Sequence, residues 1–451
     1  NKLKSQRKRA TQFDNMYSSK EITKPPLRIA ENLTSINISA SILSIEDRCF
    51  SQCFNLRSIS VDSDNLQFAS LDGILFSKNF QMLLCFPSSH QFTNYIIPTN
   101  VSSIGNSAFS RCSNLRSIII PTSVTSIGNS AFSGCDQLES ITIPATVTSI
   151  GNSPFSYCYK LKSIEVESNN LNYASQDGIL FTKDFQRLIC FPSKHQFSTY
   201  TIPESVKSID DSAFIQCLTL RSITIPVGVT SIGNSAFSFC SFIQSITIPS
   251  GVTSIGNSAF YRCSTLQSIL IPATVTSIGK SAFSDCYELQ SITIPANVSS
   301  IGDSAFSNCI NLHSIDIDSN NLHYASQDGI LFTKDFQRLI CFPSKQPSST
   351  YTIPTSVTSI DDSAFFVCRN LRSITIPSSV ASIGNETFSQ CSNLRTIEFL
   401  ANVSSIGNFM FYRCFNLQSI TIPTSVTSIG DEAFSHCSNL QSITIPTSVT
   451  S

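Results

Sequence analysis

Apolar residues recur along this chain at fixed intervals, and residues 115–138 display the whole pattern. Ile118 and Ile120 alternate with their neighbours, which predicts a short strand with one face turned inward, and Pro121 ends that strand. The residues that follow place apolar side chains at i, i+1, i+4 and i+7, which predicts one or two helical turns. The apolar positions of this stretch are Leu115, Ile118, Ile120, Val124, Ile127, Ala131, Phe132, Cys135 and Leu138.

The same pattern repeats along nearly the whole chain, and the cysteines mark its period. Successive cysteines are separated by one constant interval within three series: Cys112, Cys135 and Cys158; Cys217, Cys240, Cys263, Cys286 and Cys309; and Cys368, Cys391, Cys414 and Cys437. A fixed period of this size is typical of a solenoid. One coil cannot bury its own apolar face, so neighbouring coils must stack. We therefore expect an α/β repeat solenoid with a continuous parallel β-sheet on one face and short helical turns opposite.

Three longer repeats interrupt the series, near residues 57–112, 162–217 and 313–368. The cysteines that flank them lie further apart, as Cys53 and Cys112, Cys158 and Cys217, and Cys309 and Cys368. The second and third share an identical stretch, residues 173–194 and 324–345. There Asp177 and Gly178 form a turn signal, and the apolar runs 179–181 and 188–191 predict two antiparallel strands. Each long repeat is thus expected to carry a β-hairpin extension.

The repeat defines the domain organisation. Residues 31–451 form the solenoid, and residues 1–30 form a non-repetitive basic segment that we interpret as a solvated tail in preference to a phosphate-binding cluster. The chain starts at Asn1 and stops at Ser451 inside a repeat, so both ends look cut. This fragment contains no apolar run of the signal-peptide type and no membrane segment.

Composition argues against several classes of function. Charged residues make up 13% of the chain and the net charge is -1, which favours no nucleic-acid partner. The five histidines are scattered, and we find no catalytic motif and no cofactor-binding motif, so no enzyme activity is expected. Acidic pairs begin the long repeats at Asp62 and Asp64, Glu165 and Glu167, and Asp316 and Asp318. Calcium binding there is the weaker interpretation, and solvated turn residues are the favoured one.

The chain has 17 cysteines, and thirteen occupy one position of the repeat. We expect a ladder of buried free thiols that pack as small apolar side chains. Equivalent residues of stacked coils lie roughly 4.8 Å apart, so pairing of neighbouring thiols remains an alternative.

The outward position of the predicted strands is mostly threonine, which makes a long hydroxyl surface. Departures from threonine are candidate partner-binding residues: Ile96, Ile119, Leu270, Glu165, Asp316 and Glu398. Candidate N-glycosylation sites are Asn32, Asn37, Asn100, Asn297, Asn385 and Asn402.

The repeat LxxIxIPxxVxxIGxxAFxxCxxL, seen from Leu138 to Leu161, resembles the BspA-like leucine-rich repeat. The long repeat, with its YxSxDGxLF segment, resembles the same family, and the likeness covers residues 33–451. The place of the usual asparagine is filled by Ser123, Thr146 and Gly228, so a continuous buried asparagine ladder is not expected.

The resemblance implies a right-handed leucine-rich repeat coil and a surface or secreted protein that attaches to host matrix or cells. We therefore expect a non-enzymatic protein that mediates adhesion through protein or glycan partners. The alternative is a cytoplasmic scaffold that binds a resident protein. The oligomeric state stays open.

Overall fold

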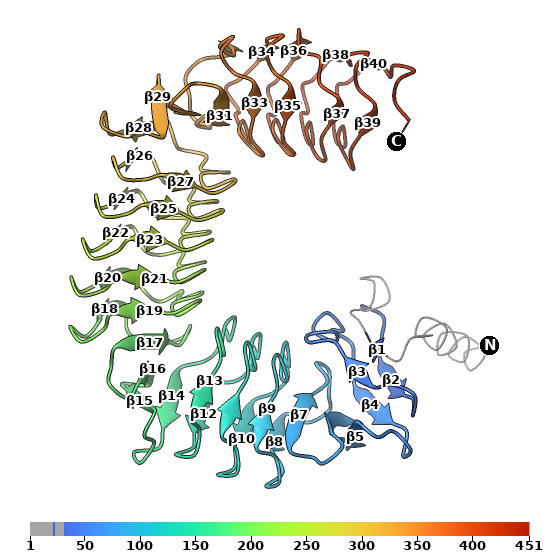
Figure 1. The fold of residues 1–451 in the computed structure, drawn as a ribbon, viewed down its shortest axis with the longest axis vertical. Coiled ribbons are helices and arrows are strands. Elements are labelled where there is room, and N and C mark those ends of the chain that lie inside the picture. The colour runs from blue at the N-terminus through green and yellow to red at the C-terminus, as the bar shows by residue number, and fades with distance from the viewer. Residues whose placement is uncertain (1–20, 23–30, 451) are drawn as a thin grey trace. The chain divides into compact units, whose positions relative to one another are not determined.

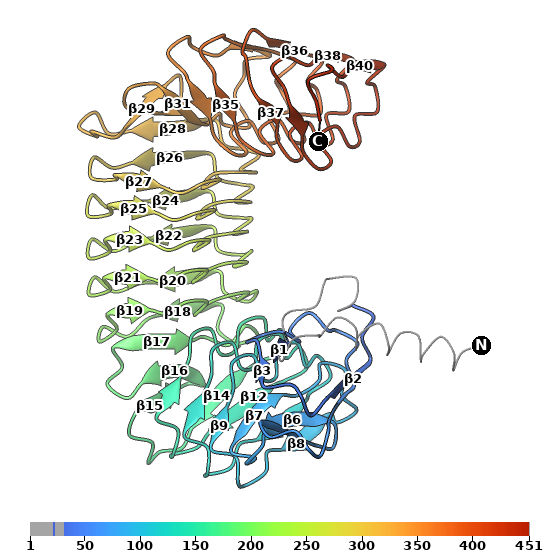
Figure 2. The ribbon, with the colours of Figure 1, turned by 45° about the vertical axis from the view of Figure 1, so that its right-hand side comes forward.

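The computed structural model of the protein describes residues 21–22 and 31–450. These residues form two compact units. Unit 1 contains the described residues up to Gln196 together with Asp210–Thr219, and unit 2 contains Phe197–Ile209 together with the described residues from Leu220 onward. Each unit is a stack of flat coils (Figures 1 and 2). The predicted basic segment, residues 1–30, lies outside the described residues except for β1 (Glu21–Ile22), which pairs in parallel with β3 (Ser44–Ile45).

The first strand of each coil, which usually precedes a proline, forms what we call the pre-proline row. Its members in unit 1 are β2 (Ser35–Ile38), β4 (Ser58–Val61), β8 (Asn94–Ile96), β10 (Ser117–Ile119), β12 (Ser140–Ile143) and β14 (Ser163–Val166). Its members in unit 2 are β18 (Thr199–Thr201), β20 (Ser222–Thr224), β22 (Ser245–Thr247), β24 (Ser268–Leu270), β26 (Ser291–Ile294), β28 (Ser314–Ile317), β32 (Thr350–Thr352), β34 (Ser373–Ile376), β36 (Thr396–Phe399), β38 (Ser419–Thr421) and β40 (Ser442–Thr444).

All pairings in this row are parallel, as expected, but the single continuous sheet is not formed. The row is divided into ladders of two or three strands, such as β8 with β10 and β12 with β14. The physical reason is that the strands are only three or four residues long, and the proline that commonly follows has no N–H to continue the ladder.

A second row of parallel strands was not predicted. Its two-residue Ser-Ile strands precede the repeat glycine, so we call it the pre-glycine row. Unit 1 contributes β9 (Ser103–Ile104), β11 (Ser126–Ile127) and β13 (Ser149–Ile150), besides β1 and β3. Unit 2 contributes β19 (Ser208–Ile209), β21 (Ser231–Ile232), β23 (Ser254–Ile255), β25 (Ser277–Ile278), β27 (Ser300–Ile301), β33 (Ser359–Ile360), β35 (Ser382–Ile383), β37 (Ser405–Ile406) and β39 (Ser428–Ile429).

Each long repeat adds three strands, not the two expected. They are β5 (Phe68–Leu71), β6 (Ile74–Ser77) and β7 (Met82–Cys85); β15 (Tyr173–Gln176), β16 (Ile179–Thr182) and β17 (Arg187–Cys190); and β29 (Tyr324–Gln327), β30 (Ile330–Thr333) and β31 (Arg338–Cys341). Consecutive members pair antiparallel. The strands β7 and β31 then pair in parallel with β9 and β33. The third strand therefore belongs to the pre-glycine row, and does not project from it.

The described residues contain no helix, so the prediction of short helical turns is wrong. In a helix every N–H bonds to the carbonyl four residues earlier. Here the N–H of Phe109 donates to the carbonyl of Ala131 in the next coil, at 2.7 Å, and that of Arg111 donates to Ser133. The alternate N–H groups donate to the carbonyl three residues earlier, as in Ser110 to Ser107 and Cys112 to Phe109. Every second N–H group of this segment thus donates to the next coil, and the hydrogen bonds of a helix cannot form.

The core of each coil is the set of apolar positions that the pattern predicts. Ile118, Ile120, Val124, Ile127 and Phe132 are all buried. Phenylalanines of successive coils stack, as in Phe109 with Phe132 at 5.1 Å between ring centroids and Phe237 with Phe260 at 5.4 Å. Because rings such as Phe109 and Phe132 each lie between two others, the apolar core runs along the axis of each stack.

The repeat glycine is required by the close approach of neighbouring coils. A Cβ atom on Gly128 would lie 2.6 Å from the backbone nitrogen of Asn106 and 2.7 Å from the carbonyl carbon of Gly105. The following asparagine uses this closeness, since Asn106 Oδ1 accepts a hydrogen bond from the N–H of Asn129 at 2.8 Å. The same bond recurs one coil further on, where the N–H of Asn152 donates to Asn129 Oδ1. An asparagine ladder therefore exists, but on the exposed side of the coils.

A buried asparagine occurs once in each long repeat: Asn65, Asn170 and Asn321 are fully buried. Asn170 Nδ2 donates to the carbonyls of Pro144 and Val147, while its Oδ1 accepts from the N–H groups of Asn172 and Tyr173. With these four bonds the side chain fastens the long repeat to the coil before it.

Candidate binding surface

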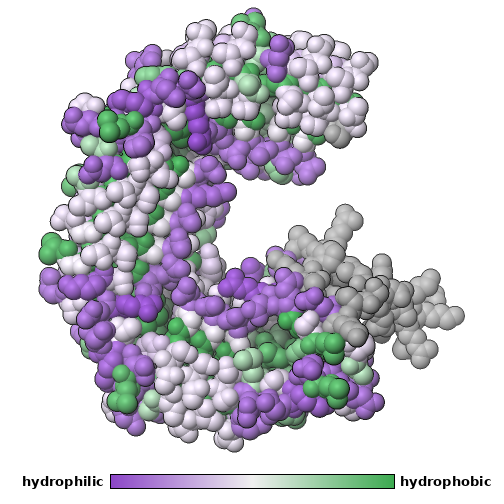
Figure 3. Space-filling model, viewed as in Figure 1, coloured by the Kyte–Doolittle hydropathy of each residue, from purple (hydrophilic) through white to green (hydrophobic). Residues whose placement is uncertain are grey.

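The pre-proline row presents one exposed side chain per strand between two inward-facing residues. On β12 and β26, for example, the sequence Ser-Ile-Thr-Ile follows the order exposed, buried, exposed, buried, so the threonine lies between two inward isoleucines. Figure 3 shows that much of the molecular surface in this view has the intermediate hydropathy of serine and threonine. The surface is therefore rich in hydroxyl groups and poor in charge, and residues that differ from this background stand out.

Ile96 and Ile119 form the clearest departure, as direct neighbours in the register of β8 with β10. Their side chains are 66% and 57% exposed. Beside them, Ser117 Oγ donates to Asn94 Oδ1 at 2.7 Å, and both of these residues are exposed. The arrangement is a small apolar centre with a polar margin, which is the usual anatomy of a protein contact site.

The other candidate residues are exposed as well, but they do not gather. Leu270 is 68% exposed and lies beside Thr247 in unit 2. Glu165 on β14 lies beside Thr142 of β12, and Asp316 on β28 lies beside Thr293 of β26. Glu398 accepts a hydrogen bond from the hydroxyl of Thr375 at 3.1 Å. Leu270, Glu165, Asp316 and Glu398 are thus four separate exposed positions, and a binding role for them stays a prediction.

Three further exposed apolar residues, all leucines, were not predicted as candidates. Leu66, Leu171 and Leu322 are 75–83% exposed and follow the buried asparagine of each long repeat. Their signal in the sequence is an Asn-Leu pair at the same place in all three long repeats. The six candidate N-glycosylation asparagines are all exposed.

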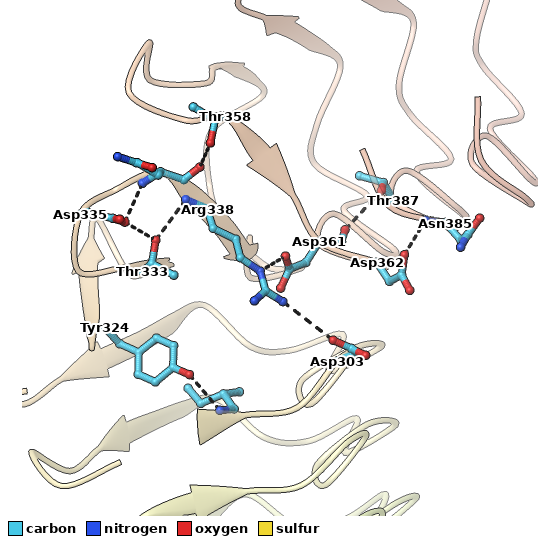
Figure 4. Close-up of polar contacts among 12 residues, drawn as sticks. Asp303, Tyr324, Thr333, Asp335, Arg338, Thr358, Asp361, Asp362, Asn385 and Thr387 are labelled. Atoms are coloured by element: carbon cyan, nitrogen blue, oxygen red, sulfur yellow. Dashed lines mark hydrogen bonds and ion pairs between the residues drawn. The ribbon is translucent and has the colours of Figure 1, made fainter. Parts of the chain in front are cut away.

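Polar side chains in the long repeats hold the backbone. In the third long repeat (Figure 4), the guanidinium of Arg338 pairs with Asp361 and reaches Asp303 at 3.8 Å, while the hydroxyl of Tyr324 accepts the N–H of Ile301 at 2.9 Å. Burial raises the pKa of Asp361, although the nearby Arg338 opposes that rise. Tyr173 accepts the N–H of Ile150 in the second long repeat. These groups are fully engaged in holding the fold.

Histidines and acids have structural partners too. His90 Nε2 bonds to the carbonyl of Asp72 at 2.8 Å, and His195 makes the equivalent bond to Asp177. Asp62 and Asp318 accept N–H groups of their own turns. Within residues 21–22 and 31–450, no three His, Cys, Asp or Glu side chains are arranged to hold a metal ion, and no apolar helix has membrane-spanning length.

All 17 cysteines lie in the described part of the chain and are free thiols. Most are buried, which fits the expected thiol ladder better than the alternative of paired neighbours.

Comparisons with known proteins agree with this architecture. The family profile described as "BspA type Leucine rich repeat region (6 copies)" matches residues 11–81, 84–183, 187–313 and 339–451. No curated protein shows significant sequence similarity to the chain.

Solved structures of repeat proteins are similar to it. A leucine-rich cell surface protein from Faecalibacterium prausnitzii A2-165 is 30% identical, with a TM-score of 0.55, over 86% of this chain and 89% of that one. The pneumococcal vaccine antigen PcpA is 22% identical, with a TM-score of 0.43, over 82% and 79%. The profile covers most of the chain, and both the short repeat and the long repeat are present. The chain therefore belongs to the BspA-type leucine-rich repeat family.

Proposed function

We propose that this protein is a non-enzymatic binding protein, exposed at the cell surface or secreted, that contacts a protein partner through its pre-proline row. The similar protein from Faecalibacterium prausnitzii is described as a cell surface protein. Attachment to host matrix proteins, which the resemblance implies, is the specific role we propose. The observation that carries the proposal is the exposed pair Ile96 and Ile119.

The pair has the properties of an interface centre. Burial of one large aliphatic side chain contributes about 1.5–3 kcal/mol, so two adjacent isoleucines can supply a substantial part of a protein contact. Ser117 and Asn94 beside them, and Thr142 on the next strand, offer hydrogen-bonding groups at the margin. A surface of many equal coils also adds further weak contacts on either side.

Binding to immobilised fibronectin, laminin and collagen tests this proposal. The double variant Ile96→Thr/Ile119→Thr installs the residue that most other strands carry, so the coils keep their fold. We expect the variant to bind at least tenfold more weakly. The matched control is Thr201→Ser/Thr224→Ser, which changes two neighbouring strands in unit 2 and is expected to bind like the unchanged protein. Equal binding by the isoleucine variant would exclude this pair.

The location is tested separately by labelling intact cells with a membrane-impermeant biotin reagent. Label on this protein supports the surface assignment. Protection from label, together with absence from the culture medium, would contradict it. In a eukaryotic secretory route, a mass shift on enzymatic removal of N-glycans would identify which of the six exposed asparagines are modified.

A further inference from the structure

A groove crosses the turn face of unit 1 where the first long repeat separates two coils. On one side lie Arg48 and Phe54, and on the other lies Arg111, which belongs to the coil that follows the long repeat. The groove continues over the next two coils to Tyr157 and Tyr159. Its volume is about 680 Å³. All of these residues belong to unit 1.

Gly134 makes a notch in the middle of this groove. It occupies the position before the repeat cysteine, where other coils carry a larger side chain: Arg111, Tyr157, Gln216, Phe239, Arg262, Asp285, Asn308, Val367, Gln390, Arg413 and His436. A Cβ atom on Gly134 would lie 3.1 Å from Arg111 Cγ. Arg111 thus packs closely against the Gly134 backbone, and no side chain at position 134 stands between Arg111 and Tyr157 in the groove.

Three aromatic side chains line the groove. Phe54 is 36% exposed and Tyr159 is 46% exposed, while Tyr157 is half-buried. The guanidinium carbon of Arg111 lies 4.7 Å from the centroid of the Phe54 ring. The amide Nε2 of buried Gln216 donates to the Tyr159 hydroxyl at 3.1 Å and so holds that ring in place.

Small polar residues complete the lining of the groove. They are Ser110, Ser130 and Ser133, together with the acidic residue Asp136. Because every surrounding coil stacks on its neighbours, these groups are held in place before any ligand arrives.

We propose that this groove binds a saccharide. A sugar ring has an apolar face of C–H groups and a rim of hydroxyls. The tyrosine and phenylalanine rings match the first, and the serine hydroxyls, Asp136 and Arg111 match the second. A nucleic acid fits less well, since only two arginines line the groove and the chain carries a net charge of -1. The site is separate from the proposed protein-binding residues Ile96 and Ile119.

The test is a printed array of neutral and acidic oligosaccharides, followed by calorimetric titration of the sugar that binds best. The key variant is Gly134→Arg, which fills the notch with the residue that three other coils carry at this position. Its fold is checked by circular dichroism and by the unfolding temperature. We expect at least a tenfold loss of affinity in Gly134→Arg, and a comparable loss in Phe54→Ala.

Two controls complete the design. Arg413→Gly makes the reverse exchange at the equivalent position of unit 2 and is expected to bind sugar like the unchanged protein. Ile96→Thr/Ile119→Thr is also expected to keep sugar binding, which separates this site from the proposed protein-binding function. Absence of binding to every sugar on the array, or equal binding by folded Gly134→Arg, would overturn the proposal. Salt-sensitive binding of single-stranded RNA in place of sugar would overturn it as well.

Discussion

The thiol of Cys135 donates a hydrogen bond to the carbonyl oxygen of Phe109 in the preceding coil, with 3.2 Å between sulfur and oxygen. The same bond recurs from Cys158 to Phe132 at 3.1 Å and from Cys391 to Phe365 at 3.0 Å. The repeated cysteine therefore does more than fill space, because its thiol donates a second hydrogen bond to a carbonyl that already accepts an N–H in its own turn, as Phe109 accepts that of Cys112. That role requires the protonated thiol.

The thiol ladder predicts that the protein loses stability at alkaline pH. Burial raises the pKa of Cys53 to about 11 and that of Cys85 to about 12, from an ordinary value of 9.0. Between pH 9 and 11 the unfolded chain therefore releases thiol protons that the folded chain keeps. The stabilisation is complete below pH 9 and is lost as pH rises, by about 1.4 kcal/mol per pH unit for each such thiol.

The measurement is the urea midpoint of unfolding at pH 7, 9 and 10 under reducing conditions. Cys135→Ala removes one buried thiol, so its midpoint should fall less steeply with pH while lying lower at pH 7. An unchanged midpoint from pH 7 to 10 would argue against ionisation of the ladder.

Substitution of the repeat glycine should be costly only where a full coil precedes it. In Gly128→Ala the new Cβ meets backbone atoms of Asn106 and Gly105 at 2.6–2.7 Å, so we expect a loss of about 3 kcal/mol in the free energy of unfolding. Gly105 follows a long repeat, and its Cβ would meet only the Leu83 carbonyl, at 3.1 Å, at so short a distance. Gly105→Ala should cost about 1 kcal/mol or less. Equal losses in the two urea titrations would refute this explanation.

A double-mutant cycle isolates the contribution of the Arg338–Asp361 ion pair to the free energy of unfolding. Arg338→Met leaves the buried carboxylate of Asp361 without its cation and should cost about 2 kcal/mol at pH 7. The double variant Arg338→Met/Asp361→Gly reproduces Met82 and Gly105 of the first long repeat, so most of the loss should be recovered.

The pH dependence gives an independent check on that pair. Burial already raises the pKa of Asp361, and removal of Arg338 raises it further. A carboxyl with a raised pKa destabilises the fold least when it is protonated. The loss of unfolding free energy in Arg338→Met should therefore shrink as the pH falls toward 4. A deficit that stays constant from pH 7 to 4 would show that lost packing, and not charge, causes it.

His90 offers a substitution for which the chain supplies its own control. Its Nε2 bonds to the Asp72 carbonyl and its Nδ1 accepts from the N–H of Phe92 at 3.2 Å. In the third long repeat, Gln346 Nε2 makes the equivalent bond to the Asp328 carbonyl. We expect His90→Gln to cost less than about 1 kcal/mol and His90→Ala to cost about 2–3 kcal/mol in thermal unfolding. Similar losses would mean that packing of the ring, and not this bond, is what matters.

Much of the fold follows from the sequence because the period is strict. The inward residues of the pre-proline row and the buried Ala-Phe pair were predicted by alternation and spacing alone. The segment around Phe109 was predicted as helix and is not, since its N–H groups bond across to Ala131 and its neighbours, a choice that only stacking decides. Asp210 and Asp361 stand where other coils have the repeat glycine. Each follows a long repeat, where, as at Gly105, the preceding backbone leaves room for a side chain.

The candidate sites show the same division. Ile96 and Ile119 could be identified because they break a threonine series at a known position. The groove around Gly134 could not, because its walls come from coils on both sides of a long repeat and its notch depends on one absent side chain. The sequence shows a glycine at position 134, but only the structure shows which side chains surround it.

The exposed asparagine ladder has a consequence for how this kind of chain can change in length. Asn234 Oδ1 accepts from the N–H of Asn257, and Asn257 Oδ1 accepts from that of Lys280, always at the same offset along the chain. Loss or duplication of one whole turn would leave each donor facing an equivalent acceptor. The stack can therefore differ in length by whole coils while each of these hydrogen bonds keeps an equivalent partner.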